Sequence, residues 1–198
     1  MRRETAPIDS TAAMFTFVSS RSAFVAQKKL YGYLKTRMGT RFPSMFEDDV
    51  FVGSINIAKM HVFAACLADM TVHAISRVTA GSGLSADERN GLAMRCFETG
   101  IADNRDHAPE GAEAAWKEAF AKRLEGLHWE NLASGGTAFT ESPKALVRWA
   151  PIADELKRYD REIVENSVTF SWPEHTRDFA ARAVPEAIVE DWKASQAK

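Results

Sequence analysis

The sequence has little cysteine and no excess of either charge. Its 198 residues include two cysteines, and 25 basic and 27 acidic residues give a formal net charge of −2. Two cysteines cannot build a disulfide framework and fit a reducing compartment, so we expect a cytoplasmic location. A near-neutral chain is not a general binder of polyanions. The length and the 45% of hydrophobic residues suit one soluble domain with its own core.

Long uncharged hydrophobic runs are also lacking. The most apolar segment, residues 50–78, is long enough to span a bilayer, but it contains Lys59, Asp69 and Arg77. A charge near the bilayer centre costs at least about 2.5 kcal/mol. We therefore interpret this segment as the core helix of a soluble protein. The basic residues near the N-terminus are not followed by an apolar run, so a secretory signal is not expected.

Strand-like alternation is scarce, whereas signals for helix starts and stops recur. Residues 44–47 and 85–88 both read Ser-x-x-Glu, the spacing of a capping box, and Gly39 is placed to end a helix. A helix as long and as apolar as the one predicted at about 45–79 is best placed at the centre of a bundle. The sequence therefore predicts an all-α, single-domain bundle of six to eight helices around this central helix.

The expected organisation is a flexible N-terminal arm over residues 1–14 and one all-α domain over residues 15–198. A seam near 81–84 divides the charge, because residues 1–83 carry a net charge of +4 and the remainder carries −6. The clearest loop is predicted over residues 129–142, where small residues gather. The seam would separate two sub-bundles that attract each other, but the connections are too short for two independent domains.

Residues 20–41 form a predicted basic amphipathic helix, in which Lys28 and Lys35 share one side and Tyr31 lies on the neighbouring arc. The first interpretation is that its apolar side packs on the central helix while its basic side faces water and the acidic C-terminal half. The second is association with an anionic membrane surface. Base stacking on Tyr31 is the nucleic-acid version, which the acidic residues 47–49 disfavour.

Asp69 and His73 lie one helical turn apart in the central helix. A carboxylate at this spacing can orient an imidazole as a general base. Ser134 is the candidate nucleophile, and its small-residue loop could offer backbone N–H groups to an oxyanion. An esterase-like hydrolase is therefore one alternative function. The other interpretation is a satisfied core hydrogen bond for the pair and a plain connection for the loop.

The sequence predicts no metal site and no cofactor. Glu125 and His128 have the Glu-x-x-His spacing of di-iron bundles, but the second copy that such a site needs is absent from the sequence. The His-Glu-x-x-His motif and the nucleotide-binding glycine patterns are also absent from it.

The leading functional hypothesis is a soluble helical bundle that binds a protein partner or a small apolar ligand between its helices. Trp129, at the mouth of the long loop, is the first candidate for a binding residue if its side chain is exposed. Hydrolysis through Asp69 and His73, and peripheral membrane association through residues 20–41, are the alternatives. The sequence leaves the ligand, the partner and the oligomeric state open.

Overall fold

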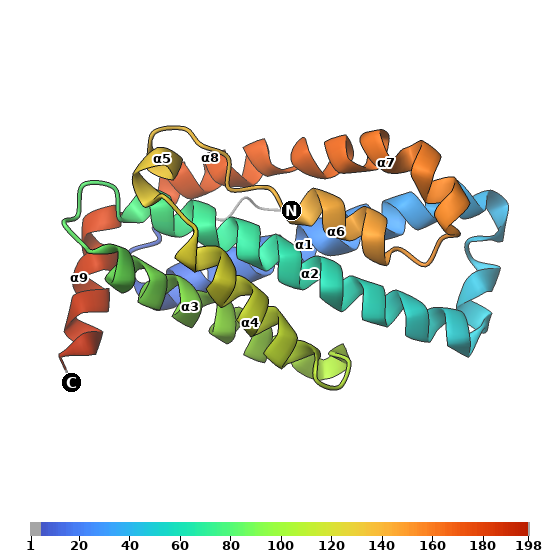
Figure 1. Ribbon diagram of the computed structural model, residues 1–198, viewed down its shortest axis with the longest axis horizontal. Coiled ribbons are helices and arrows are strands. Elements are labelled where there is room, and N and C mark those ends of the chain that lie inside the picture. Colours follow the sequence, from blue (N-terminus) through green and yellow to red (C-terminus); the bar gives the residue numbers. More distant parts are fainter. Residues whose placement is uncertain (1–4, 198) are drawn as a thin grey trace.

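A long antiparallel pair of helices organises the fold in the computed structural model, which describes residues 5–197 (Figure 1). Helix α1 (Thr11–Met38) leads through two 3-10 turns, η1 (Gly39–Arg41) and η2 (Ser44–Glu47), into α2 (Asp49–Val78). By length and composition alone α2 could cross a membrane. In this fold 18 of its 30 side chains are buried, and it packs against α1, α3 and α6. The predicted central helix is confirmed, with a start a few residues later than expected.

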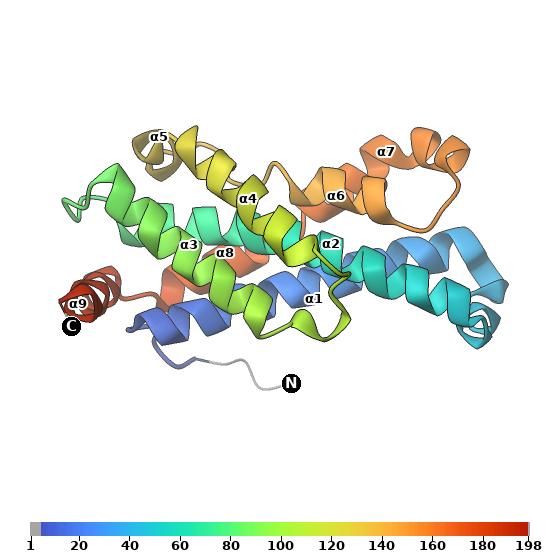
Figure 2. The ribbon, with the colours of Figure 1, turned by 60° about the horizontal axis from the view of Figure 1, so that its bottom comes forward.

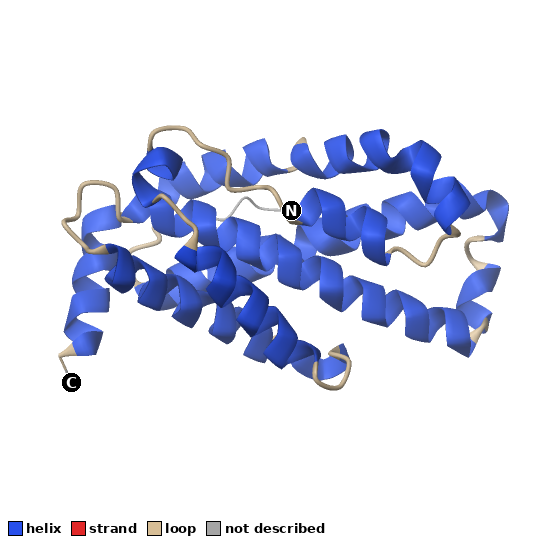
Figure 3. Ribbon diagram, viewed as in Figure 1, coloured by secondary structure: helices blue, strands red, loops and turns tan. Residues whose placement is uncertain are grey.

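Seven further α-helices cover this pair. They are α3 (Ala86–Ala102), α4 (Ala112–Glu125), α5 (Trp129–Ala133), α6 (Ser142–Trp149), α7 (Asp154–Thr169), α8 (Trp172–Arg182) and α9 (Pro185–Gln196), with a 3-10 turn η3 (Arg105–His107) before α4. In Figure 1, α3 and α4 lie below α2 while α6 to α8 lie above it, and the turned view of Figure 2 shows α4 and α6 both above α2. The described residues contain no β-strand (Figure 3). The all-α bundle is confirmed, and the five-residue α5 adds a short helix inside the predicted loop 129–142.

The two predicted capping boxes have different outcomes. At the first, Ser44 donates its hydroxyl to a carbonyl of the preceding turn, and Asp48 caps α2 instead. The Asp48 carboxylate accepts two backbone N–H groups of the first turn at 2.9 and 3.2 Å, which is a favourable N-cap. The Ser-x-x-Glu pattern just before it had placed the cap at Ser44 instead. At the second, Ser85 and Glu88 each accept the other's backbone N–H, so the box is confirmed.

The chain is packed from Ile8 onward, which corrects the expected arm 1–14 over its residues 8–14. Ile8 is buried, and its backbone exchanges two hydrogen bonds of 2.9 Å with the connection between α8 and α9. Ser10 then caps α1, so the helix begins well before the end of the expected arm. An apolar side chain that fills a core position and a good N-cap together order this segment. Residues 1–4 lie outside the described residues.

The oppositely charged parts of the chain meet along α1. Arg21 pairs with Asp178 of α8 at 3.3 Å, and Arg37 pairs with Asp160 of α7. The basic side of α1 therefore faces the acidic C-terminal half, as the first interpretation of this helix expected.

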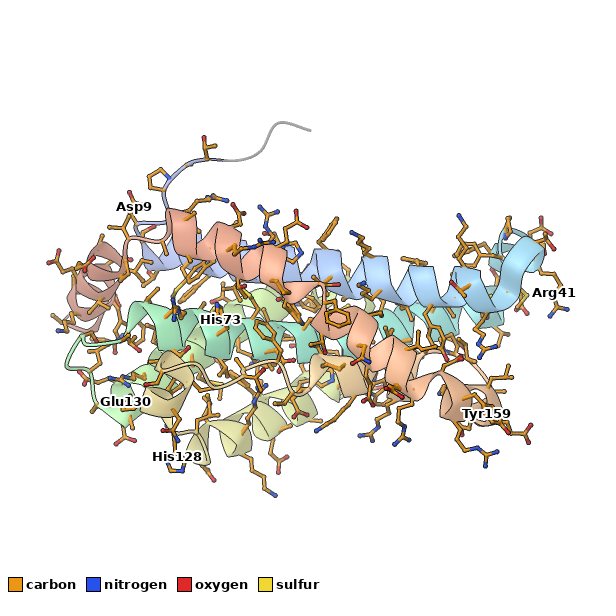
Figure 4. All side chains as sticks on the ribbon, turned by 90° about the horizontal axis from the view of Figure 1, so that it is seen from above. Asp9, Arg41, His73, His128, Glu130 and Tyr159 are labelled. Atoms are coloured by element: carbon orange, nitrogen blue, oxygen red, sulfur yellow. The ribbon has the colours of Figure 1, made fainter. Side chains whose placement is uncertain are left out.

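Helix α7 leaves one apolar side exposed. Leu156, Tyr159, Ile163 and the following Phe170 are between 44% and 78% exposed. At 100° per residue their directions fall within about 60° of one another. Tyr159 points away from the bundle at one end of the molecule (Figure 4).

Candidate functional site

Asp69 is fully buried, but its hydrogen-bond partners lie far from it in the sequence. Its carboxylate accepts Arg123 Nη1 at 2.8 Å, the Ser142 N–H at 2.7 Å and the Glu141 N–H at 3.2 Å. Burial raises the pKa of the Asp69 carboxyl, while Arg123 and the N–H groups of α6 oppose that rise. This Asp69–Arg123 bridge joins α2, α4 and the start of α6.

His73 lies in a separate aromatic environment. Its ring centroid is 5.4 Å from that of Phe139 and 6.4 Å from that of Phe179 of α8. Burial, together with the charge of Arg77, lowers the pKa of His73 to about 4. No hydrogen bond joins it to Asp69 within the described chain, so the predicted Asp-oriented base is not formed.

Ser134 and its loop serve local structure. The Ser134 hydroxyl donates to a carbonyl of α5 at 2.8 Å, and the N–H groups of Ser134, Gly135 and Gly136 all donate to carbonyls of the same short helix. A Cβ at Gly136 would lie 2.9 Å from the Asn131 carbonyl oxygen, which explains the glycine there. These N–H groups are occupied rather than presented to an oxyanion. No hydrogen bond among the described residues links Asp69, His73 and Ser134 to one another. Esterase activity stays a prediction.

The predicted binding residues divide into exposed and buried ones. Trp129 is 4% exposed and donates its indole N–H to Asn90 at 3.0 Å, so it anchors α5 to α3 and cannot be the exposed binding residue expected. Lys28 and Lys35 are exposed on α1, whereas Tyr31 is half-buried against the core. Membrane association through this helix stays a prediction.

The Glu-x-x-His spacing does not place its two side chains on one helix face. Helix α4 ends at Glu125, and His128 precedes α5. Among the side chains that the structure describes, which do not include that of His107, no group of three histidine, cysteine or acidic residues is arranged to hold a metal ion. Cys66 and Cys96 are both buried, and burial raises the pKa of each thiol.

A groove of about 790 Å³ lies between α4 and α6, with α2 as its floor. In Figure 1 α6 lies above α2 and α4 lies below it. Small side chains leave the space between these helices: Ala64, Ala65, Ala68, Ala115, Ala119 and Ala145. Larger rings complete the lining: Phe97, Trp116, Phe120 and Trp149. The Asp69–Arg123 bridge fixes both walls to the floor.

His61 and two tryptophans form a continuous aromatic cluster in this groove. The His61 ring stacks on Trp149 with 3.4 Å between centroids and 1° between planes, and Trp116 Nε1 donates to His61 Nδ1 at 3.0 Å. Burial, together with the charge of Arg148, lowers the pKa of His61 and favours the neutral ring. Because Nδ1 accepts, the neutral ring carries its proton on Nε2.

The charged lining of the groove is mostly basic. Lys122, Arg123, Lys144 and Arg148 line it, against the single acidic lining residue Glu141. Arg123 is neutralised by its buried carboxylate partner. The other three cations are exposed and form no ion pair within the described residues. The mouth of the groove therefore carries an excess of positive charge.

The groove is hard to recognise in the sequence, because the side of α4 that lines it has the apolar spacing of a helix side that packs in a core. The apolar spacing in α4 predicts that Ala115, Trp116, Ala119 and Phe120 all pack inward. Phe120 is buried, but Trp116 is half-buried and the two alanines are exposed. The available signal was chemical: alanines one turn apart leave space that larger side chains would fill.

Comparisons with known proteins add no functional assignment. The chain matches no protein-family model, no curated protein and no solved structure.

Proposed function

We propose that the protein binds a small, largely apolar ligand in the groove between α4 and α6. The observation that carries the proposal is a volume of about 790 Å³ lined by alanines and aromatic rings. Ligand sites typically have about 300–1,000 Å³, an apolar lining and few polar groups. The walls are held by the Asp69–Arg123 bridge, so the site is formed before a ligand arrives. Preformed walls lower the cost of ordering on binding.

The expected affinity is modest. A ligand that buries about 200 Å² of apolar surface gains about 5 kcal/mol at about 25 cal/mol per Å². Stacking on the exposed part of the tryptophan rings adds about 1 kcal/mol. These gains of about 6 kcal/mol correspond to a dissociation constant of about 40 µM, and the entropic cost of association weakens it toward about 1 mM.

Calorimetric titration with the neutral probe 2-naphthamide tests the proposal. Ala119→Leu places a larger side chain on the α4 wall and should weaken binding about tenfold. Ala114→Leu is the matched control, because Ala114 is an exposed alanine of the same helix that does not line the groove. Equal affinity in the Ala119→Leu variant and the wild-type protein would contradict the proposal.

Binding of a protein partner, the other part of the leading hypothesis, would use a different surface. The exposed apolar side of α7 is the observation that favours it. Glu155 and Glu162 lie at similar angles along one edge of this side, so its complement is an amphipathic helix with one basic edge.

A further inference from the structure

We infer that the ligand of this groove is a carboxylate with an apolar body, an inference that rests on the proposed function. Three exposed cations line the groove without an ion-pair partner among the described residues, and they stand on both walls. Lys122 belongs to α4, while Lys144 and Arg148 lie one turn apart on α6. Even with the charges of Asp69 and Glu141 counted, two positive charges remain in the lining.

The placement of these groups separates an acid from a neutral ligand. The alanines and aromatic rings of the lining cannot compensate the cost of desolvating a charged group. We therefore place the apolar body of the ligand on the floor of the groove and its anionic group at the mouth. There the anion meets cations from two helices at once. Arg148 lies with its guanidinium carbon 5.2 Å from the Trp149 ring centroid, which places one of these cations beside the aromatic lining.

The backbone at the groove favours a single carboxylate over a phosphate. Phosphate sites commonly use free N–H groups at a helix N-terminus. At the start of α6, the N–H groups of Glu141 and Ser142 already donate to Asp69, and Pro143 has no N–H group. The groove offers the ligand flexible, solvated side-chain cations, which suit a monoanion held by charge and by apolar contact.

Matched pairs of probes test the charge alone. One pair is 2-naphthoate and 2-naphthamide, and the second is decanoate and decan-1-ol below the concentration at which either aggregates. We expect the acid of at least one pair to bind about tenfold more tightly than its neutral partner at low salt. This preference should shrink as sodium chloride is raised, because salt screens exposed charges.

Two double variants locate the effect. Lys144→Gln with Arg148→Gln should weaken binding of the acid about four- to tenfold, at about two- to threefold for each exposed charge, and should change binding of the neutral partner less than about twofold. Lys28→Gln with Lys35→Gln makes the same change of charge on α1, away from the groove, and should leave both affinities unchanged.

The outcomes separate the two proposals. Equal affinity for acid and neutral partner in both pairs overturns the carboxylate inference and leaves the proposed function standing. Binding of none of the four probes overturns the proposed function, and the inference with it. A preference for the acid that survives the α6 variant and disappears in the α1 variant also overturns the inference, because the anion then binds elsewhere.

Discussion

Removing the charge of Arg123 should destabilise the joint between α2, α4 and α6. Arg123 donates to the Asp69 carboxylate at 2.8 Å and to the Ala138 carbonyl at 2.6 Å. The Asp69 side chain is fully buried, so water cannot replace the guanidinium in the Arg123→Met variant. The variant leaves a buried carboxylate that keeps the two backbone N–H groups at the start of α6 and the Ser142 hydroxyl as partners, but no cation.

The expected cost is large because the remaining charge is buried. Breaking one side of a buried ion pair typically costs about 3–5 kcal/mol of unfolding free energy. Asp69→Asn should cost less, about 1–3 kcal/mol, because the amide oxygen can still accept the Ser142 N–H and Arg123 is partly exposed. The double variant leaves no buried charge, so we expect a total cost close to that of Asp69→Asn alone.

Urea unfolding monitored by far-ultraviolet circular dichroism measures all four proteins. The double-mutant cycle should give a coupling free energy of at least about 2 kcal/mol. The deficit of Arg123→Met should also shrink as the pH falls, because protonation of Asp69 removes the unpaired charge. Costs that simply add in the double variant, with no pH dependence, would refute the reasoning.

Two further predictions concern His73 and the glycines of the long helices. The pKa of His73 is about 4 in the folded chain and 6.5 in the unfolded chain, so the unfolded state binds the extra proton between these values. Stability should therefore fall by about 3 kcal/mol as the pH drops from 7 to 4, and His73→Phe should remove most of that loss in urea titrations at the two pH values. Gly100→Ala should cost about 1–3 kcal/mol because the new Cβ would lie 2.8 Å from Leu67, whereas Gly32→Ala meets nothing within 4 Å and should gain up to about 1 kcal/mol in the same assay.

Controls for these two predictions come from the same chain. His128→Gln changes an exposed histidine and should leave the loss of stability at acid pH as it is in the wild-type protein. An equal loss in His73→Phe and the wild-type protein would contradict the first prediction. Urea midpoints that move in the same direction for both glycine variants would contradict the second.

Local signals in the sequence predicted the helices well because their causes are local. The capping box at Ser85 and Glu88 joins residues three positions apart, and the apolar length of α2 needs no partner to be recognised. The wrong capping box predicted at Ser44 also has a local cause. Two residues that make good N-caps, Ser44 and Asp48, stand four positions apart, and α2 begins after Asp48.

The candidate site was beyond such signals because its contacts are distant in the sequence. Asp69 has an acceptable neighbour at His73, yet its carboxylate is bound by Arg123, 54 positions later. His61 and Trp116 are 55 positions apart. The spacing of residues along a helix identifies Asp69 and His61 as candidates but not their partners. Those partners depend on how the helices pack together in the fold.

The cap that Asp69 places on α6 has a consequence for the order of folding. Helix α6 has eight residues, too few to persist alone in water, and its first N–H groups are satisfied by a side chain more than 70 positions earlier. We therefore expect this wall to form late, after α2 has found its place, since closing so long a segment is slow. Kinetic intermediates would then hold the long helical pair without a binding site, and the recovery of ligand binding during refolding should lag behind the recovery of helical signal.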